Sequence, residues 1–206
     1  MTSTQANPSF LTFEEYLNHD DGTDNRYELV AGELIEMPPP TWLHLLITKF
    51  LVRTLDQAIQ ATERESIWTT LSEPGQQTDG SSARLPDLAI VPYSAMGDVL
   101  KSAVLTIPAP LVVEIVSGNW RDDYLTKLAE YETLGVPEFW IVDYQGLGGT
   151  RYIGHPKQPT LSIYQLVDGE YQVNLFRQGE RLQSPTFPEL KLTADEVFTA
   201  GQTAKQ

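Results

Sequence analysis

Two carboxylate side chains occupy positions where the neighbouring residues are apolar. Asp87 follows Pro86 and opens the apolar segment 88–91, and Glu114 lies within the apolar segment 111–116. Burying an ionised carboxylate costs several kcal/mol unless a partner compensates it. Two carboxylates about 4 Å apart also repel each other by about 4 kcal/mol at an effective dielectric constant of about 20. A shared divalent cation would remove both costs, so the pair predicts a cation-binding site.

The residue types in the chain restrict the identity of that cation. There is no cysteine, which excludes zinc–thiolate sites, disulfides and cysteine nucleophiles. The three histidines, His19, His44 and His155, lack the paired spacing of metal ligands. An oxygen-ligated hard cation is therefore expected. Mg²⁺ fits best, because it commonly takes one or two carboxylates and keeps several waters; Mn²⁺ is the alternative.

Each acid also has a purely structural interpretation. An Asp after Pro at the start of a strand is often only a turn residue. A Glu in an apolar strand can point from the solvated face of an edge strand. Both interpretations stay open for Asp87 and Glu114 taken singly, but the occurrence of two such acids on neighbouring predicted strands favours a site.

A lysine on the following helix is the third candidate. Asp123, Lys127 and Tyr131 are spaced i, i+4 and i+8 within the predicted helix 119–134, so they share one face. A lysine there could hold or polarise an attacking water and stabilise charge that develops on a phosphate. The alternative is an exposed ion pair between Asp123 and Lys127.

The elements that must position these residues can be predicted from periodicity and turn signals. Thr12 and Glu15 have the spacing of a capping box. The predicted helices cover 12–18, 41–61, 119–134 and 194–200, and the predicted strands 27–30, 33–37, 66–71, 88–91, 111–116, 138–143, 161–165 and 171–176. The longest helix has an apolar stripe formed by Leu43, Ile47, Phe50, Leu51 and Leu55. Segment 73–82 is predicted to be a polar loop.

This order of elements predicts an α/β (mixed α+β) fold, with a central mixed sheet flanked by helices, an N-terminal hairpin and a C-terminal β segment. The chain has 206 residues, of which 41% are hydrophobic, so we expect one domain with an ordered core over about 12–198 and short polar tails. No apolar run is long enough to span a membrane, and segment 1–10 has no secretory signal. A cytoplasmic location is expected.

The net charge of −14 bears on the partners of the chain. The 14 basic residues form no cluster in the sequence, which argues against a coat-like nucleic-acid binder. It does not exclude an enzyme that grips a few phosphates through a divalent cation. Arg84 and Arg121 are candidate phosphate contacts, with simple solvated surface arginines as the alternative.

Several sequence blocks together resemble a known family. They are RYELVAGE from Arg26, a helix that opens near His44, LPDLAIV from Leu85, VVEIVS from Val112, Lys127 with Tyr131, and GVPEFWIVD from Gly135. This ordered set, which extends over about 12–198, resembles the Uma-two family of endonucleases within the PD-(D/E)XK restriction-endonuclease-like superfamily.

The resemblance implies a restriction-endonuclease-like core and magnesium-dependent cleavage of phosphodiester bonds in nucleic acid. It implies metal ligands at Asp87 and Glu114, with the carbonyl of Ile115 as a further ligand. The wider superfamily carries its lysine two residues after the acid, where this chain has Val116. In this family the lysine has moved to the following helix, which makes Lys127 the catalytic candidate.

Other residues in these blocks have less defined roles. Glu33 or His44 could complete the site, Ser117 could hold Glu114 by a hydrogen bond, and Tyr131 shares the helical face of Lys127. The role of Glu28 stays open. For each, a polar residue at the end of an element is the alternative interpretation.

The leading functional hypothesis is a metal-dependent endonuclease in which Asp87 and Glu114 hold the ion and Lys127 supports developing charge. The alternatives are a non-catalytic interaction module that retains the fold, and a phosphohydrolase of small substrates. A homodimer is expected by family analogy and from C-terminal strands that could form edges. The choice between DNA and RNA is open.

Overall fold

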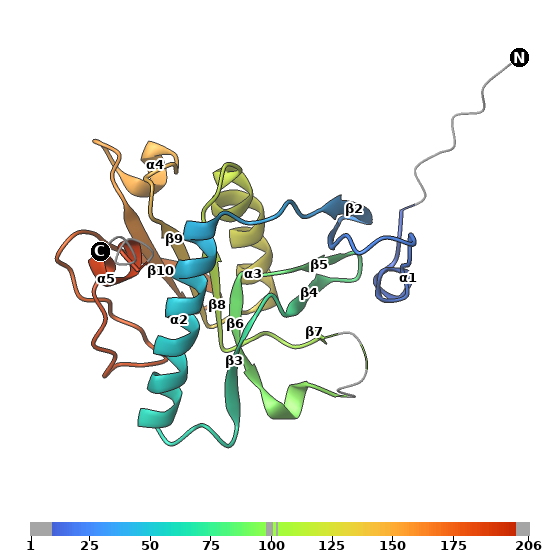
Figure 1. Ribbon diagram of the computed structural model, residues 1–206, viewed down its shortest axis with the longest axis horizontal. Coiled ribbons are helices and arrows are strands. Elements are labelled where there is room, and N and C mark those ends of the chain that lie inside the picture. The colour runs from blue at the N-terminus through green and yellow to red at the C-terminus, as the bar shows by residue number, and fades with distance from the viewer. Residues whose placement is uncertain (1–9, 98–100, 102, 201–206) are drawn as a thin grey trace, which may run out of the picture.

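The structure is a computed structural model that describes residues 10–97, 101 and 103–200. Two β-sheets and a small set of helices make up the described chain (Figure 1). The polar N-terminal segment used above to predict the absence of a signal lies mostly outside the described residues. Within the described part, no helix combines the length and apolar character needed to cross a membrane.

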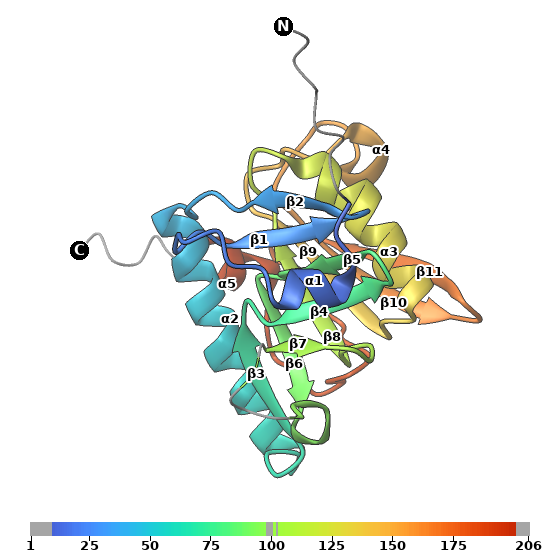
Figure 2. The same cartoon turned by 90° about the vertical axis from the view of Figure 1, so that its right-hand side faces the viewer.

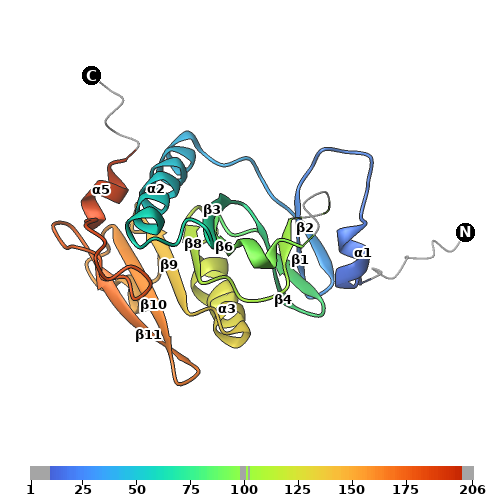
Figure 3. The ribbon, with the colours of Figure 1, turned by 90° about the horizontal axis from the view of Figure 1, so that it is seen from below.

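A six-stranded mixed sheet forms the centre of the molecule. Its strand order is β11-β10-β9-β8-β6-β3, and β8 and β9 are parallel while the other neighbours are antiparallel. Helix α2 covers one face and α3 the other (Figure 3). The strands are β3 (Trp68–Ser72), β6 (Leu88–Pro92), β8 (Leu111–Ile115), β9 (Glu138–Asp143), β10 (Thr160–Val167) and β11 (Glu170–Phe176).

Helix α2 (Trp42–Ala61) confirms the predicted long helix. The Thr41 side chain caps its first turn by accepting a hydrogen bond from the amide of His44, which satisfies one of the free N–H groups at a helix start. Ile47, Leu51 and Leu55 of the predicted stripe are fully buried against the sheet, and Leu43 and Phe50 are partly buried. His44, in the first turn of α2, contacts Asp87, the residue that precedes β6.

A second, five-stranded sheet has the order β2-β1-β5-β4-β7 (Figure 2). The predicted hairpin is present as β1 (Tyr27–Val30) and β2 (Glu33–Glu36). Helix α1 (Phe13–Leu17) begins directly after its N-cap Thr12, and the predicted capping box of Thr12 with Glu15 is formed. The other strands are β4 (Gly75–Asp79), β5 (Ser82–Arg84) and β7 (Val104–Leu105).

The prediction of a loop over 73–82 is wrong, because this segment contains β4 and the start of β5. The polar side chain of Gln76 is fully buried and stays satisfied there. Its amide group donates to the carbonyls of Leu105 and Ile107 and accepts from the amide of Ala109. Tertiary hydrogen bonds thus make a polar strand possible where composition indicated a loop.

The predicted helix 119–134 contains a π-helix, η2 (Asp122–Lys127), followed by α3 (Leu128–Leu134). Together they form the crossover between the parallel strands β8 and β9. Gly135 ends the helix with φ of 89°, the left-handed conformation that glycine adopts at lowest cost. The short helices α4 (Thr150–Ile153) and α5 (Ala194–Phe198) complete the fold, and α4 was not predicted.

Candidate active site

The register of β6 and β8 brings the two predicted acids together. Leu88 pairs with Val113 and Ala89 with Val112, so continuing the antiparallel register by one residue places Asp87 opposite Glu114. Directly opposed residues project from the same face of a sheet. Both acids line one cavity of about 380 Å³, called here the carboxylate cavity. The two acids therefore face one cavity, as the sharing of one cation would require.

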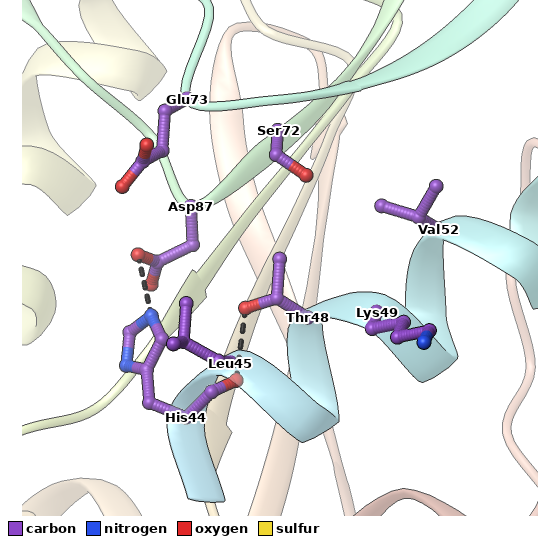
Figure 4. A pocket seen from close by; sticks show the side chains of 8 residues that line it. All are labelled: His44, Leu45, Thr48, Lys49, Val52, Ser72, Glu73 and Asp87. Atoms are coloured by element: carbon purple, nitrogen blue, oxygen red, sulfur yellow. Dashed lines mark hydrogen bonds and ion pairs between the residues drawn. The ribbon is translucent and has the colours of Figure 1, made fainter. Parts of the chain in front are cut away.

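Asp87 is held on both of its carboxylate oxygens. Its Oδ2 accepts a hydrogen bond of 2.6 Å from the amide of Ile115, and its Oδ1 lies 2.8 Å from Nε2 of His44. Figure 4 shows this second contact between the end of the strand and helix α2. Burial alone lowers the pKa of His44, but the hydrogen bond and charge of Asp87 outweigh it and raise that pKa. His44 is thus a direct neighbour of the candidate metal ligand.

Glu114 is buried and makes two side-chain contacts with the crossover helix. Its Oε2 accepts a hydrogen bond of 3.0 Å from Nζ of Lys127, and its Oε1 accepts one of 2.9 Å from the hydroxyl of Tyr131. Lys127 Nζ also lies 3.3 Å from Glu28 and 3.9 Å from Asp123. The alternative of an exposed Asp123–Lys127 pair is wrong, because Asp123 and Lys127 are both buried.

The charges around Lys127 are strongly coupled. Burial alone lowers the pKa of Lys127, but the carboxylates of Glu114, Glu28 and Asp123 together raise it well above its usual value. Lys127 is therefore an ammonium ion at neutral pH. Burial raises the pKa of Glu114 well above its usual value. The positive charge of Lys127 opposes this rise, and the nearby carboxylates of Asp87, Asp123 and Glu28 add to it.

Asp123 and Glu28 respond to the same environment in opposite directions. Burial raises the pKa of Asp123 to about 7, with Lys127 opposing and Asp87 adding to the rise. Burial would also raise the pKa of Glu28, but Lys127, the amide of Leu85 and Arg84 together lower it. The cluster therefore holds more carboxylates than its cations can neutralise, and part of it retains protons.

The prediction of Arg84 as a phosphate contact is corrected by its burial. Only 1% of Arg84 is exposed, and its guanidinium makes a bidentate contact of 2.7 Å and 2.7 Å with Glu130. The remaining Nη1 lies 3.0 Å from Glu28 and 3.4 Å from Asp122. Its donors point into carboxylates, so Arg84 orients Glu28 beside Lys127 and does not reach a bound phosphate.

Of the other predicted residues, Ser117 lines the carboxylate cavity, whereas Glu33 and Arg121 do not. Ser117 is an exposed residue of that lining. The predicted hydrogen bond from Ser117 to Glu114 is wrong, because the two oxygens of Glu114 accept hydrogen bonds from Lys127 and Tyr131. Glu33 is exposed on β2 and is not among the residues that line the cavity. Arg121 is exposed and directly precedes Asp122, which lines the cavity. Glu33 is thus separate from the candidate site.

Three acids that sequence reasoning left without a role belong to the same network. Glu28, Asp122 and Glu130 surround Arg84, and Glu28 links Arg84 to Lys127. In the sequence, the position of Glu28 between apolar residues of a predicted strand was the one local indication of this network. Its partners lie 56 residues away at Arg84 and on the crossover helix, so spacing could not reveal them.

The cavity fits an oxygen-ligated divalent cation by its donor chemistry. Its lining includes the imidazole of His44, two basic side chains, Arg26 and Lys127, and seven carboxylates. The carboxylates are those of Glu28, Glu36, Glu73, Asp87, Glu114, Asp122 and Asp123. Across the described ranges, no group of three or more His, Asp or Glu side chains is placed so that it could hold a metal ion. The carboxylate oxygens that line the cavity are the donor type that hard divalent cations prefer.

Comparison with known proteins gives a family and a related structure. The sequence model of the Uma2 family, described as "Putative restriction endonuclease", matches residues 13–195. The crystal structure of "a putative nuclease belonging to DUF820 from Anabaena variabilis ATCC 29413" is similar, with a TM-score of 0.69 and 18% sequence identity over 93% of this chain and 99% of that chain. No curated protein matches the chain.

These similarities confirm the predicted restriction-endonuclease-like fold class, with two mixed sheets where one central sheet was expected. The family match extends from the first helix to the last one. It includes every residue of the carboxylate cavity and of the Arg84 network. The chain therefore belongs to the Uma2 (Uma-two) restriction endonuclease family.

Proposed function

We propose that this protein is a magnesium-dependent nuclease that hydrolyses phosphodiester bonds of nucleic acid at the carboxylate cavity. One observation carries the proposal: Asp87 and Glu114 face the same cavity from neighbouring strands, with the ammonium group of Lys127 held on Glu114. The family supports nuclease chemistry. Manganese would occupy the same oxygen ligands.

In this proposal Asp87 and Glu114 would hold the ion, and the carbonyl of Ile115 would be a further ligand. The bound ion would activate water and neutralise the scissile phosphate. The amide of Ile115 and Nε2 of His44 orient the Asp87 carboxylate, so its position is fixed before a ligand arrives. Such preorganisation avoids a rearrangement during the reaction.

Lys127 acts as a charged donor in this mechanism. Because the surrounding carboxylates raise its pKa, it keeps its proton at neutral pH and does not serve as a general base. An ammonium group beside Glu114 can donate a hydrogen bond to a water or to a phosphate oxygen that gains charge. The hydroxyl of Tyr131 holds the other oxygen of Glu114 and so keeps the acid aligned with Lys127.

The proposal is tested by cleavage assays with Asp87→Asn and Glu114→Gln. The substrates are single- and double-stranded DNA, RNA and small phosphate esters, each with magnesium, manganese or a chelator. We expect the wild-type protein to cleave a polymer only with the metal, and each variant to lose at least about 100-fold in rate, since each removes one ligand charge. Glu170→Gln, at an exposed position of β11, is the matched control.

The alternatives give different results in the same assay. Turnover of small esters without polymer cleavage would indicate a phosphohydrolase. Absence of any turnover, together with a stable complex, would indicate an interaction module. Wild-type rates in Asp87→Asn or Glu114→Gln would contradict the proposed site.

Three further expectations accompany this function. We propose a single folded domain, a cytoplasmic location and a homodimer, for which β11 and β3 offer free edges at the two ends of the six-stranded sheet. Unpaired edge strands can pair with a second chain. Sedimentation at several protein concentrations would distinguish the dimer from the monomer.

A further inference from the structure

An aromatic and basic surface lies beside the carboxylate cavity. It is formed where α4 packs against the start of the crossover helix, and these two segments are neighbours in both Figure 1 and Figure 2. The rings of Trp120 and Tyr152 lie with their centroids 6.4 Å apart. We call this the α4 surface and define it by Trp120, Arg121, Arg151, Tyr152 and Lys157.

Three cations of the α4 surface lie over its rings. The guanidinium carbon of Arg121 is 4.8 Å from the centroid of Trp120, and Nζ of Lys157 is 5.9 Å from the same centroid. The guanidinium carbon of Arg151 is 6.0 Å from the ring of Tyr152. Contact with an aromatic face restrains a cation and leaves N–H donors free for an anion.

These three cations differ from the basic residues of the site. Arg84, Lys127 and Arg26 are each paired with acids, whereas no acidic side chain in the described chain lies within ion-pair distance of Arg121, Arg151 or Lys157. All three are exposed. Lys157 Nζ donates a hydrogen bond of 3.1 Å to the carbonyl of Leu147, which leaves its charge without an acidic partner. In a chain with 28 acidic and 14 basic residues, three cations without an acidic partner on one surface are a local reversal of charge.

The α4 surface adjoins residues of the carboxylate cavity along the chain. Trp120 and Arg121 stand between Asn119 and Asp122 in the chain, and both of those residues line the cavity. Arg121 is exposed and directly precedes Asp122 of the cavity lining, so a polymer that extends past Asp122 could bring a neighbouring phosphate to Arg121. The acidic cavity lacks free cations to hold those phosphates, and the α4 surface supplies them.

We infer that the α4 surface binds the phosphate backbone of the substrate strand next to the phosphate that enters the cavity. Arg121, Arg151 and Lys157 contact phosphates, and the rings of Trp120 and Tyr152 hold the cations in place and offer apolar contact to sugars or bases. This inference rests on the proposed function, because it assigns the substrate contacts of that same site.

The test compares two variants of equal charge. One carries Arg121→Gln, Arg151→Gln and Lys157→Gln. The control carries Arg53→Gln, Arg64→Gln and Lys191→Gln, which removes two arginines that also lie over rings, those of Phe50 and Trp68, and one exposed lysine. None of the three control positions lines the carboxylate cavity.

Binding is measured by fluorescence anisotropy with labelled single-stranded DNA, double-stranded DNA and RNA, in chelator so that no cleavage occurs. We expect the α4-surface variant to bind at least about 10-fold more weakly at low salt. The slope of log K against log salt should fall by about 0.7 to 0.9 for each phosphate contact removed. The control variant should keep the wild-type slope, and the polymer that binds best identifies the nucleic acid.

The outcomes separate this inference from the proposed function. If the α4-surface variant loses binding while wild-type protein cleaves nothing, the surface is assigned correctly and the nuclease proposal fails. If wild-type protein cleaves but both triple variants keep its salt slope, the inference is overturned and the nuclease proposal stands. It is also overturned if wild-type protein binds none of the polymers, or if the variant changes only the sedimentation mass, which would make the surface a contact between copies.

Discussion

At Lys127 a single buried ammonium group lies close to Glu28, Glu114 and Asp123, with Arg84 as the next cation in the network. These groups are one electrostatic system, because each carboxylate changes the charge that its neighbours tolerate. Arg84 and Lys127 share Glu28. The position of Lys127 therefore depends on residues that do not border Glu114.

The first prediction concerns Arg84, whose replacement by Met should destabilise the fold. Arg84→Met leaves Glu130 without its cation and Glu28 with Lys127 alone, so the free energy of unfolding should fall by about 3–5 kcal/mol, as measured by urea denaturation. Arg26→Met is the matched control, because Arg26 pairs with Glu73 at the surface, where a pair contributes about 1 kcal/mol or less. Equal effects of the two substitutions would contradict the buried network.

The second prediction concerns pH and Asp123. Its pKa is about 7 in the folded protein, against an ordinary value of 3.8. Between these pH values the folded protein keeps a proton that the unfolded chain has released. The contribution of Asp123 to stability is therefore fully present below pH 3.8 and is lost as the pH rises to about 7.

Thermal or urea unfolding between pH 4 and pH 8 tests this behaviour. Asp123→Asn cannot ionise, so its stability should fall less than that of wild-type protein over this range. The difference between the two proteins should level off above pH 7. Parallel stability profiles would show that Asp123 has an ordinary pKa.

Among the elements, those with strong local patterns could be predicted and those stabilised from a distance could not. Helix α2 follows from its apolar stripe, and the hairpin β1–β2 from its Ala31–Gly32 turn, where both residues have positive φ. Strand β4 was missed because Gln76 and its neighbours look like loop residues. Segment 105–109, distant in the chain, supplies three of the four hydrogen-bond partners of the buried Gln76 side chain.

The candidate site follows the same rule. The sequence could predict Asp87 and Glu114, because acids in apolar strands are a local signal. It could also predict the helical face shared by Lys127 and Tyr131, because i, i+4 spacing is local. The π-helix did not disturb that face, since both Lys127 and Tyr131 reach Glu114. The burial of Arg84 was not readable, because it depends on carboxylates from a different strand and from the crossover helix.

The third prediction tests the polar core of β4. Gln76→Leu removes the side-chain hydrogen bonds to four backbone groups, of which those to Leu105 and Ala109 are buried, so the free energy of unfolding should fall by about 3 kcal/mol. Gln77→Leu is the neighbouring control, because the Gln77 side chain donates only to the exposed carbonyl of Asp79, and it should change stability by less than about 1 kcal/mol. Chemical denaturation of both variants provides the measurement. A stable Gln76→Leu protein would mean that water replaces the lost amide.

For the whole molecule, the distribution of charge connects stability with ligand binding. The chain has a net charge of −14, and the carboxylate cavity concentrates part of it. Cations should therefore accumulate around the protein in general and at the cavity in particular. Diffuse accumulation depends on the total charge and hardly changes when one carboxylate is removed, whereas binding at the cavity depends on its individual carboxylates.

The fourth prediction separates them by thermal unfolding with magnesium. An ion that binds only the folded protein at about ten times its Kd adds about 1.4 kcal/mol of stability. Millimolar magnesium should raise the Tm of wild-type protein more than that of Asp87→Asn or Glu114→Gln, whereas Glu170→Gln should behave as wild type. Equal increases in all four proteins would indicate diffuse screening without a site.

The placement of the basic group on the crossover helix has a mechanical consequence. A lysine two residues beyond the acid on one strand would be tied to it by a few covalent bonds. Here 13 residues separate Glu114 and Lys127, and their distance is maintained by the packing of a helix against a sheet. Any agent that loosens this packing should separate the two groups while most of the fold persists, so turnover should disappear at a lower urea concentration than the global unfolding signal.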